Sequence, residues 1–168
     1  MTSLTRITMA LACVAGCSSG GEQAQGSDEA AATTAAGGAC EILTAADVSA
    51  VTGVSVSRID RNPAIGAGGT CANFAGEDGQ VYLGVNRLAG DAEFSASVNA
   101  VPVDLYPEKV SVPNLGEEAV LFKAPGGLRY LIARQGASGV VLFPLGAGLA
   151  MSDQQLTGLA ERALASAR

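Results

Sequence analysis

The feature that most limits how this chain folds is a long N-terminal stretch without large apolar side chains. Ser18–Ala39 consists mainly of glycine, serine, alanine and threonine. Such a segment cannot bury enough surface to offset the entropy that ordering would cost. A flexible coil of this length has an end-to-end distance of roughly 25 Å. We therefore expect residues 17–39 to form a tether and residues 40–168 to form a single folded domain.

A short apolar run precedes the tether. Met1–Arg6 carries one positive charge, and Ile7–Gly16 is mostly apolar. Because a membrane span needs about 20 apolar residues, residues 1–16 instead fit a secretory signal peptide. The sequence Val14-Ala15-Gly16-Cys17 resembles the lipobox of bacterial lipoproteins. The resemblance implies cleavage after residue 16, attachment of a diacylglycerol to Cys17 and further acylation of the new amino group.

Lipidation at Cys17 would also fix the location of the protein. Two or more acyl chains hold a protein stably on a bilayer. We therefore expect a protein of the cell envelope that is lipid-anchored to a membrane, with its domain on the exported side. The alternative is an ordinary signal peptide in which Cys17 is incidental.

The other cysteines are best interpreted after this one is assigned. Cys13 leaves with the signal peptide, so Cys40 and Cys71 remain as an even pair in an oxidising compartment. A disulfide between them would stabilise the fold by about 3–4 kcal/mol. Two buried free thiols are the alternative. A metal site is disfavoured because two cysteines without histidine make an incomplete ligand set, and we expect no cofactor.

Helix and strand patterns predict an α+β fold. Thr44 with Asp47, and Ser152 with Gln155, have capping-box spacing, which predicts helices over 45–52 and after Ser152. A middle helix is expected to be capped by Asp91. Strand patterns lie at 70–75, 80–88, 118–123, 128–135 and 139–145. The expected order is α-ββ-α-βββ-α, with an antiparallel sheet of about five strands and helices packed on it.

Several segments together resemble one known family. They are Cys40–Gly53 (CEILTAADVSAVTG), the strand with Cys71, Asn114–Ala119 (NLGEEA) and the closing helix LTGLAERAL. They are similar to a family of small envelope lipoproteins, common in actinobacteria, that carries a domain of unknown function. The resemblance implies a tethered α+β domain with a disulfide, and it supplies no catalytic residues.

The sequence argues against catalysis. It contains no histidine, which removes Ser-His-Asp and Cys-His mechanisms. Neither Lys109 nor Lys123 lies in a Ser-x-x-Lys motif. Four carboxylates could form a glycosidase-like pair or a cation site, but they lack the spacing for either and are interpreted as solvated charge: Asp104, Glu108, Glu117 and Glu118. We therefore expect no catalytic residues and no enzyme activity.

The charge of the chain excludes one class of partner. Without residues 1–16 it has nine basic and sixteen acidic side chains. An acidic domain without a basic cluster repels phosphate backbones, so we expect no nucleic-acid partner.

Two non-enzymatic functions remain. Val101–Glu117 is longer than a simple connection needs and places Leu105 and Tyr106 between prolines, which favours contact with an envelope protein. The alternative for this segment is a short edge strand at Val110 and Val112 within a plain connection. The alternative function is binding of an apolar or lipidic small ligand, for which Gly84, Ala119 and Ala133 would leave room.

Overall fold

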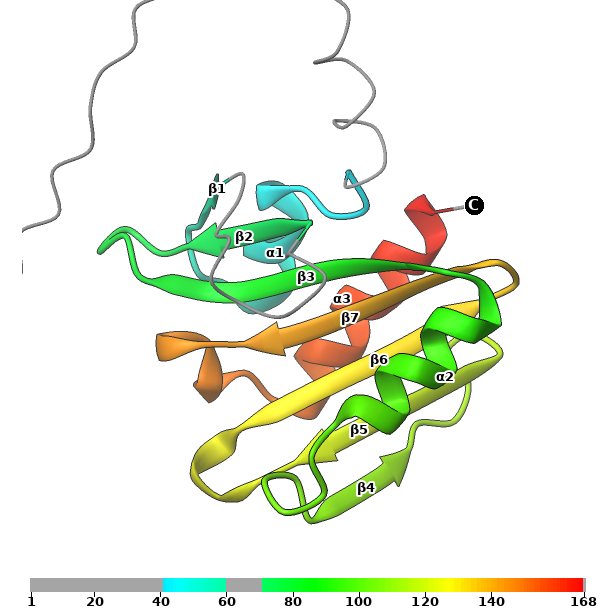
Figure 1. The fold of residues 1–168 in the computed structure, drawn as a ribbon. Helices are drawn as coiled ribbons and strands as arrows, with labels where there is room; N and C mark the ends of the chain where they lie inside the picture. Colours follow the sequence, from blue (N-terminus) through cyan, green and yellow to red (C-terminus); the bar gives the residue numbers. More distant parts are fainter. Residues whose placement is uncertain (1–40, 60–70, 168) are drawn as a thin grey trace, which may run out of the picture. The chain divides into compact units, whose positions relative to one another are not determined.

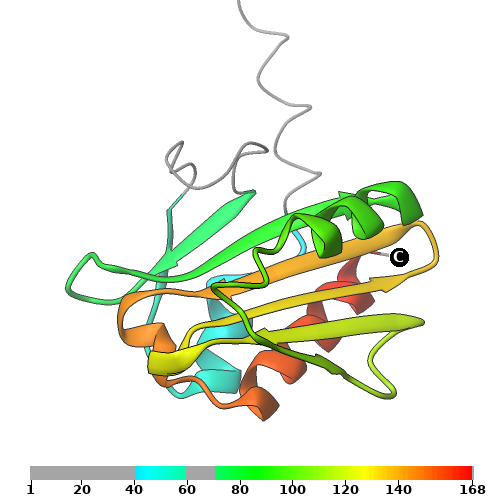
Figure 2. The ribbon, with the colours of Figure 1, turned by 60° about the horizontal axis from the view of Figure 1, so that its bottom comes forward.

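A computed structural model describes residues 41–59 and 71–167, and these form a sheet with helices on both faces (Figures 1 and 2). The sheet is antiparallel throughout and has seven strands. They are β1 (Ser57–Ile59), β2 (Ala72–Ala75), β3 (Val81–Ala89), β4 (Glu108–Ser111), β5 (Glu118–Lys123), β6 (Arg129–Gln135) and β7 (Ser138–Pro144). The predicted α+β class with an antiparallel sheet is therefore confirmed.

The strand order is β1-β2-β3-β7-β6-β5-β4. A hairpin of β2 and β3 is joined at the centre to a meander that runs from β4 to β7. The central pair aligns β3 with β7 from Leu83 opposite Pro144 to Ala89 opposite Ser138. Strands β1 and β4 consequently lie at opposite edges of the sheet.

The first face is covered by α1 (Ala45–Thr52) and α3 (Asp153–Ser166). Both helices begin with the predicted capping box, since Thr44 accepts from the Asp47 amide and Ser152 from the Gln155 amide. The largest buried group of side chains lies between these helices and the sheet, and it includes Leu43, Val48, Phe74, Leu142, Leu156 and Leu159. We call this the helix-pair face.

The second face is covered by α2 (Gly90–Ala100). Phe94, Val98 and Val101 project from this segment onto the sheet as predicted, against residues such as Ile132 and Phe143. We call this the α2 face. Successive side chains of β5, β6 and β7 therefore point alternately to the helix-pair face and to the α2 face.

The start of α2 differs from the prediction. Asp91 does not cap it; the N-cap is Ala89, two residues earlier, and it makes no side-chain cap hydrogen bond. The Glu93 carboxylate instead accepts from the Ala89 amide at 2.6 Å. The Asp91 carboxylate instead forms an ion pair of 2.9 Å with Arg134.

The predicted number and order of strands were wrong. The structure adds β1 and β4, each of only three or four residues at an edge of the sheet. Such short strands carry little periodicity of their own and form because a longer neighbour offers backbone partners. The edge strand proposed as the alternative for residues 110–112 does occur, shifted to Glu108–Ser111.

Two short 3₁₀ turns complete the elements, η1 (Pro125–Gly127) and η2 (Gly146–Ala150). Within residues 41–59 and 71–167, no helix has the length and apolar character needed to cross a membrane.

Candidate functional site

The loop between α2 and β4 carries the most exposed large apolar side chains of the described chain. Val103 is 75% exposed and Leu105 is 63% exposed, whereas Val54, Ile59 and Leu128 are each below 40%. Exposed Asp104 lies between them. We call Val103–Leu105 the apolar tip.

The backbone of the loop is folded into a tight turn. The amides of Leu105 and Tyr106 both donate to the carbonyl of Pro102, at 3.1 and 3.0 Å. Pro102 and Pro107 bracket the turn and restrict its backbone. The apolar tip is therefore preorganised, which lowers the entropy lost when it binds.

The structure separates the two residues that the sequence singled out. Leu105 points to solvent, but Tyr106 packs on the α2 face. Its ring centroid lies 6.2 Å from that of Tyr130, which in turn lies 6.0 Å from Phe143 in a stacked arrangement. Burial of Tyr130, helped by the nearby Tyr106, raises the pKa of its phenol. Tyr106 thus anchors the loop, and Val103, which sequence reasoning missed, joins Leu105 at the surface.

Strand β4, which follows the loop, is protected against pairing with another strand. The Val112 amide donates to Ala119 at 3.0 Å. Hydrogen-bonded and non-hydrogen-bonded residue pairs alternate along antiparallel strands. Since Val112 belongs to a hydrogen-bonded pair, Lys109 and Ser111 direct their backbone groups away from β5. The next positions with this outward direction are Pro107 and Pro113, which have no N–H to donate. Prolines at such positions block edge-to-edge association.

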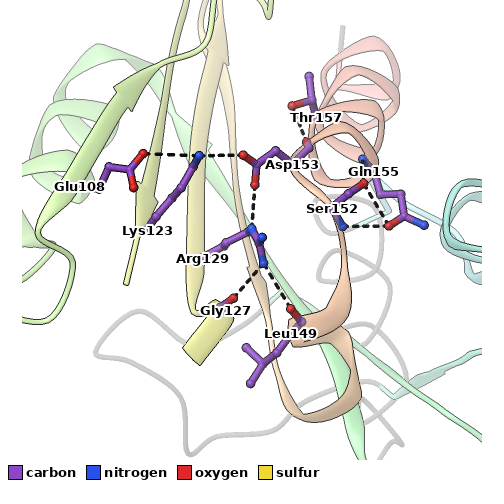
Figure 3. Close-up of polar contacts among 9 residues, drawn as sticks. All are labelled: Glu108, Lys123, Gly127, Arg129, Leu149, Ser152, Asp153, Gln155 and Thr157. Carbon is purple, nitrogen blue, oxygen red and sulfur yellow. Dashed lines mark hydrogen bonds and ion pairs between the residues drawn. The ribbon is translucent and has the colours of Figure 1, made fainter. Parts of the chain in front are cut away.

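An ionic network joins β4, β5 and β6 to the start of α3 (Figure 3). The Asp153 carboxylate binds Lys123 at 2.8 Å and Arg129 at 2.7 Å. Lys123 also lies 3.5 Å from Glu108. Arg129 donates in addition to the carbonyls of Gly127 and Leu149.

The same contacts shift the pKa values of this network. The hydrogen bond from Lys123 lowers the pKa of Asp153, with a smaller contribution from Arg129. The Asp153 carboxylate raises the pKa of Lys123. Every charged group is matched, so the network stabilises the fold and offers no uncommitted acid or base.

A second ionic cluster surrounds Arg134 on β6. Its guanidinium binds Asp91 at 2.9 Å, Glu117 at 3.0 Å and Glu118 at 3.3 Å, and lies 5.5 Å from the Phe94 ring centre. Of these groups, Asp91, Glu117 and Arg134 border a shallow open hollow of about 370 Å³. The carboxylates nominated from the sequence are thus divided: Glu117 and Glu118 bind Arg134, Glu108 binds Lys123, and Asp104 lies in the apolar tip.

The residues proposed as walls of a ligand pocket are packed. Gly84 lies under the ring of Phe143, which a methyl group there would overlap. Ala119 and Ala133 lie in the core below the helix pair, where their small size lets the helices approach the sheet. None of the three lines the hollow near Arg134 or the groove of about 450 Å³ beside Val51 and α3.

The cysteine predictions fall mostly outside the described residues. Cys17 and Cys40 lie there, as do residues 1–16 and the tether. Cys71 precedes β2 and is disulfide-bonded, while its pairing with Cys40 stays a prediction. Within the described ranges, no group of three Cys, Asp or Glu residues is placed to hold a metal ion.

Comparisons with known proteins do not assign the chain. No family model, curated protein or solved structure matches it. The resemblance to envelope lipoproteins therefore stays a prediction.

Proposed function

We propose that this chain is an exported lipoprotein held to a membrane through Cys17, and that its domain is a non-enzymatic interaction module of the cell envelope. The observation that carries the proposal is the preorganised apolar tip. Val103 and Leu105 are exposed to solvent on a turn that is fixed by hydrogen bonds, by two prolines and by the packing of Tyr106. Binding residues are disproportionately found on loops that a rigid scaffold positions in this way.

The absence of histidine from the sequence supports the non-enzymatic part of the proposal. The two clusters of charged groups support it as well. Those of the network around Asp153 are committed to one another, and those around Arg134 neutralise a cation.

Anchoring is tested by Cys17→Ala in the full chain. The native chain is expected in the membrane fraction and in the detergent phase on detergent partitioning, because acyl chains are attached. The variant is expected to lose the mass of the lipid. A native chain that carries no lipid mass on Cys17 would refute the anchor.

Interaction is tested through the lysines, since Lys109 and Lys123 are the only two in the sequence. Lys109 is exposed on β4, the strand that follows the loop. An amine-reactive, photoactivatable cross-linker applied to intact cells is expected to join Lys109 to a specific envelope protein. Lys109→Arg is the matched control, because it keeps the charge but not the reactive amine. If both chains retrieve the same proteins, the contact does not lie at Lys109, and if neither chain retrieves a specific envelope protein, the interaction module is wrong.

A further inference from the structure

We propose that the apolar tip docks on a protein whose surface offers an apolar pocket bordered by arginine or lysine side chains, and not on the lipid bilayer. This inference rests on the proposed function, since it names the partner of the same surface.

The charge within the tip favours a protein. Asp104 is exposed between Val103 and Leu105, so neither apolar side chain is buried without the carboxylate coming close to the contact. Hydrocarbon offers a carboxylate no partner, and its entry there is costly. A protein can place a cation beside the pocket and form a charge-assisted hydrogen bond. The chain as a whole has more acidic than basic side chains, and this excess also favours a partner surface with positive charge.

The position of the tip in the fold also favours a protein. The tip leads into β4, and β4 and β1 are the two edges of the sheet, about 30 Å apart at the usual strand spacing. The first element of the described chain, α1, lies on the side of β1 and β2, away from the loop between α2 and β4 (Figure 1). The tip therefore lies far from the point where the chain enters the domain.

The geometry also limits how the partner binds. A partner strand could pair along β4 only over Lys109 to Ser111, because Pro107 and Pro113 have no N–H to donate at the next outward positions. Contact is thus largely confined to the tip and to exposed side chains of β4 such as Lys109, whose amine lies 5.6 Å from the Phe122 ring centre. Such a surface is smaller than stable complexes need, which indicates a transient contact. Shared anchoring to one membrane would raise the effective concentration of the two proteins and offset weak affinity.

The experiment uses the full chain in its own membrane, with a photoreactive phenylalanine analogue at position 103. Position 154, exposed on α3, is the matched control site. We expect a protein adduct from position 103 at least tenfold above that from position 154. We expect Leu105→Asp and Asp104→Lys each to reduce this adduct at least tenfold, and Asp104→Asn to reduce it less. The cross-linked peptide should contain arginine or lysine.

Each other outcome overturns the inference. Lipid adducts at position 103 would show that the tip meets the bilayer. A protein adduct that Asp104→Lys leaves unchanged would show that no arginine or lysine side chains border the pocket. Adducts from position 154 but not from position 103 would refute this inference and leave the interaction module standing, whereas no adduct from either site would refute both. An unchanged thermal unfolding midpoint in each variant serves as the folding control.

Discussion

The two faces of the sheet differ in how completely they are covered. The helix-pair face lies under two helices, and its core residues Leu142, Leu156 and Leu159 are fully buried. The α2 face lies under one helix of eleven residues. At one end of that face Tyr106, Tyr130 and Leu145 are only partly buried, and the loop with the apolar tip takes the place of a helix. The comparison separates a face that stabilises the fold from a face that is partly available for contact.

The largest expected effect tests this contrast with the same substitution on both faces. Leu159→Ala removes a fully buried side chain from the helix-pair face and should lower the free energy of unfolding by about 2–5 kcal/mol. Leu145→Ala, at the partly covered end of the α2 face, should lower it by about 1 kcal/mol or less. Urea unfolding followed by circular dichroism measures both. Equal losses would contradict the difference between the faces.

The next effect concerns the close packing inside the α2 face. Gly84→Ala would bring a methyl group into the ring of Phe143, and we expect a loss of about 1–3 kcal/mol in the free energy of unfolding. Phe143→Leu makes space, so the double variant should lose less than the sum of the two single variants. Strict additivity in this cycle would show that the ring does not fill the space above Gly84.

A smaller effect should appear in the dependence of stability on pH. The pKa of Asp153 is lowered by Lys123 and Arg129. A lowered pKa in the folded state gives stability that is present above about pH 4 and is lost as the pH falls through the folded value. At pH 7, Asp153→Asn should lower the free energy of unfolding by about 1 kcal/mol or less, because the carboxylate is partly exposed.

The measurement is a series of unfolding curves from pH 7 to pH 2 for both chains. The difference between them should shrink below about pH 4. A difference that stays constant over this range would mean that the charge of Asp153 contributes nothing. The pKa of Lys123 is raised, so its contribution is present below about pH 10.5 and should disappear as the pH rises further.

The smallest expected effect is at the apolar tip. Leu105→Ala changes a side chain that is 63% exposed, so the free energy of unfolding should stay within about 0.5 kcal/mol of the native value. Thermal unfolding measures this. A clear loss of stability would show that Leu105 belongs to the core of the α2 face and not to a contact surface.

The sequence predicted the features that depend on neighbouring residues. The capping boxes at Thr44 and Ser152 and the apolar stripe of α2 were found because each is encoded within a few positions. The edge strand β1 was missed and β4 was foreseen only as an alternative, since the pairing of both depends on longer neighbours. For the same reason the strand order could not be derived.

The candidate site was predicted only in part. Proline spacing pointed to the loop, but the burial of Tyr106 depends on Tyr130, which is 24 positions away. The ion pair between Arg129 and Asp153 likewise joins distant residues. No local signal marks such pairs, so the division between a buried anchor and an exposed tip needed the structure.

The central pairing of β3 with β7 bears on the export that we propose for this chain. The two strands that close the middle of the sheet are separated by the whole of α2, β4, β5 and β6. A chain that emerges from its N-terminus cannot complete the sheet until Pro144 has appeared, and α3 covers its face later still. Pairing over such a separation is slow to form. A polypeptide that must cross a membrane before folding would gain from this delay, because its early segments have no finished sheet to join.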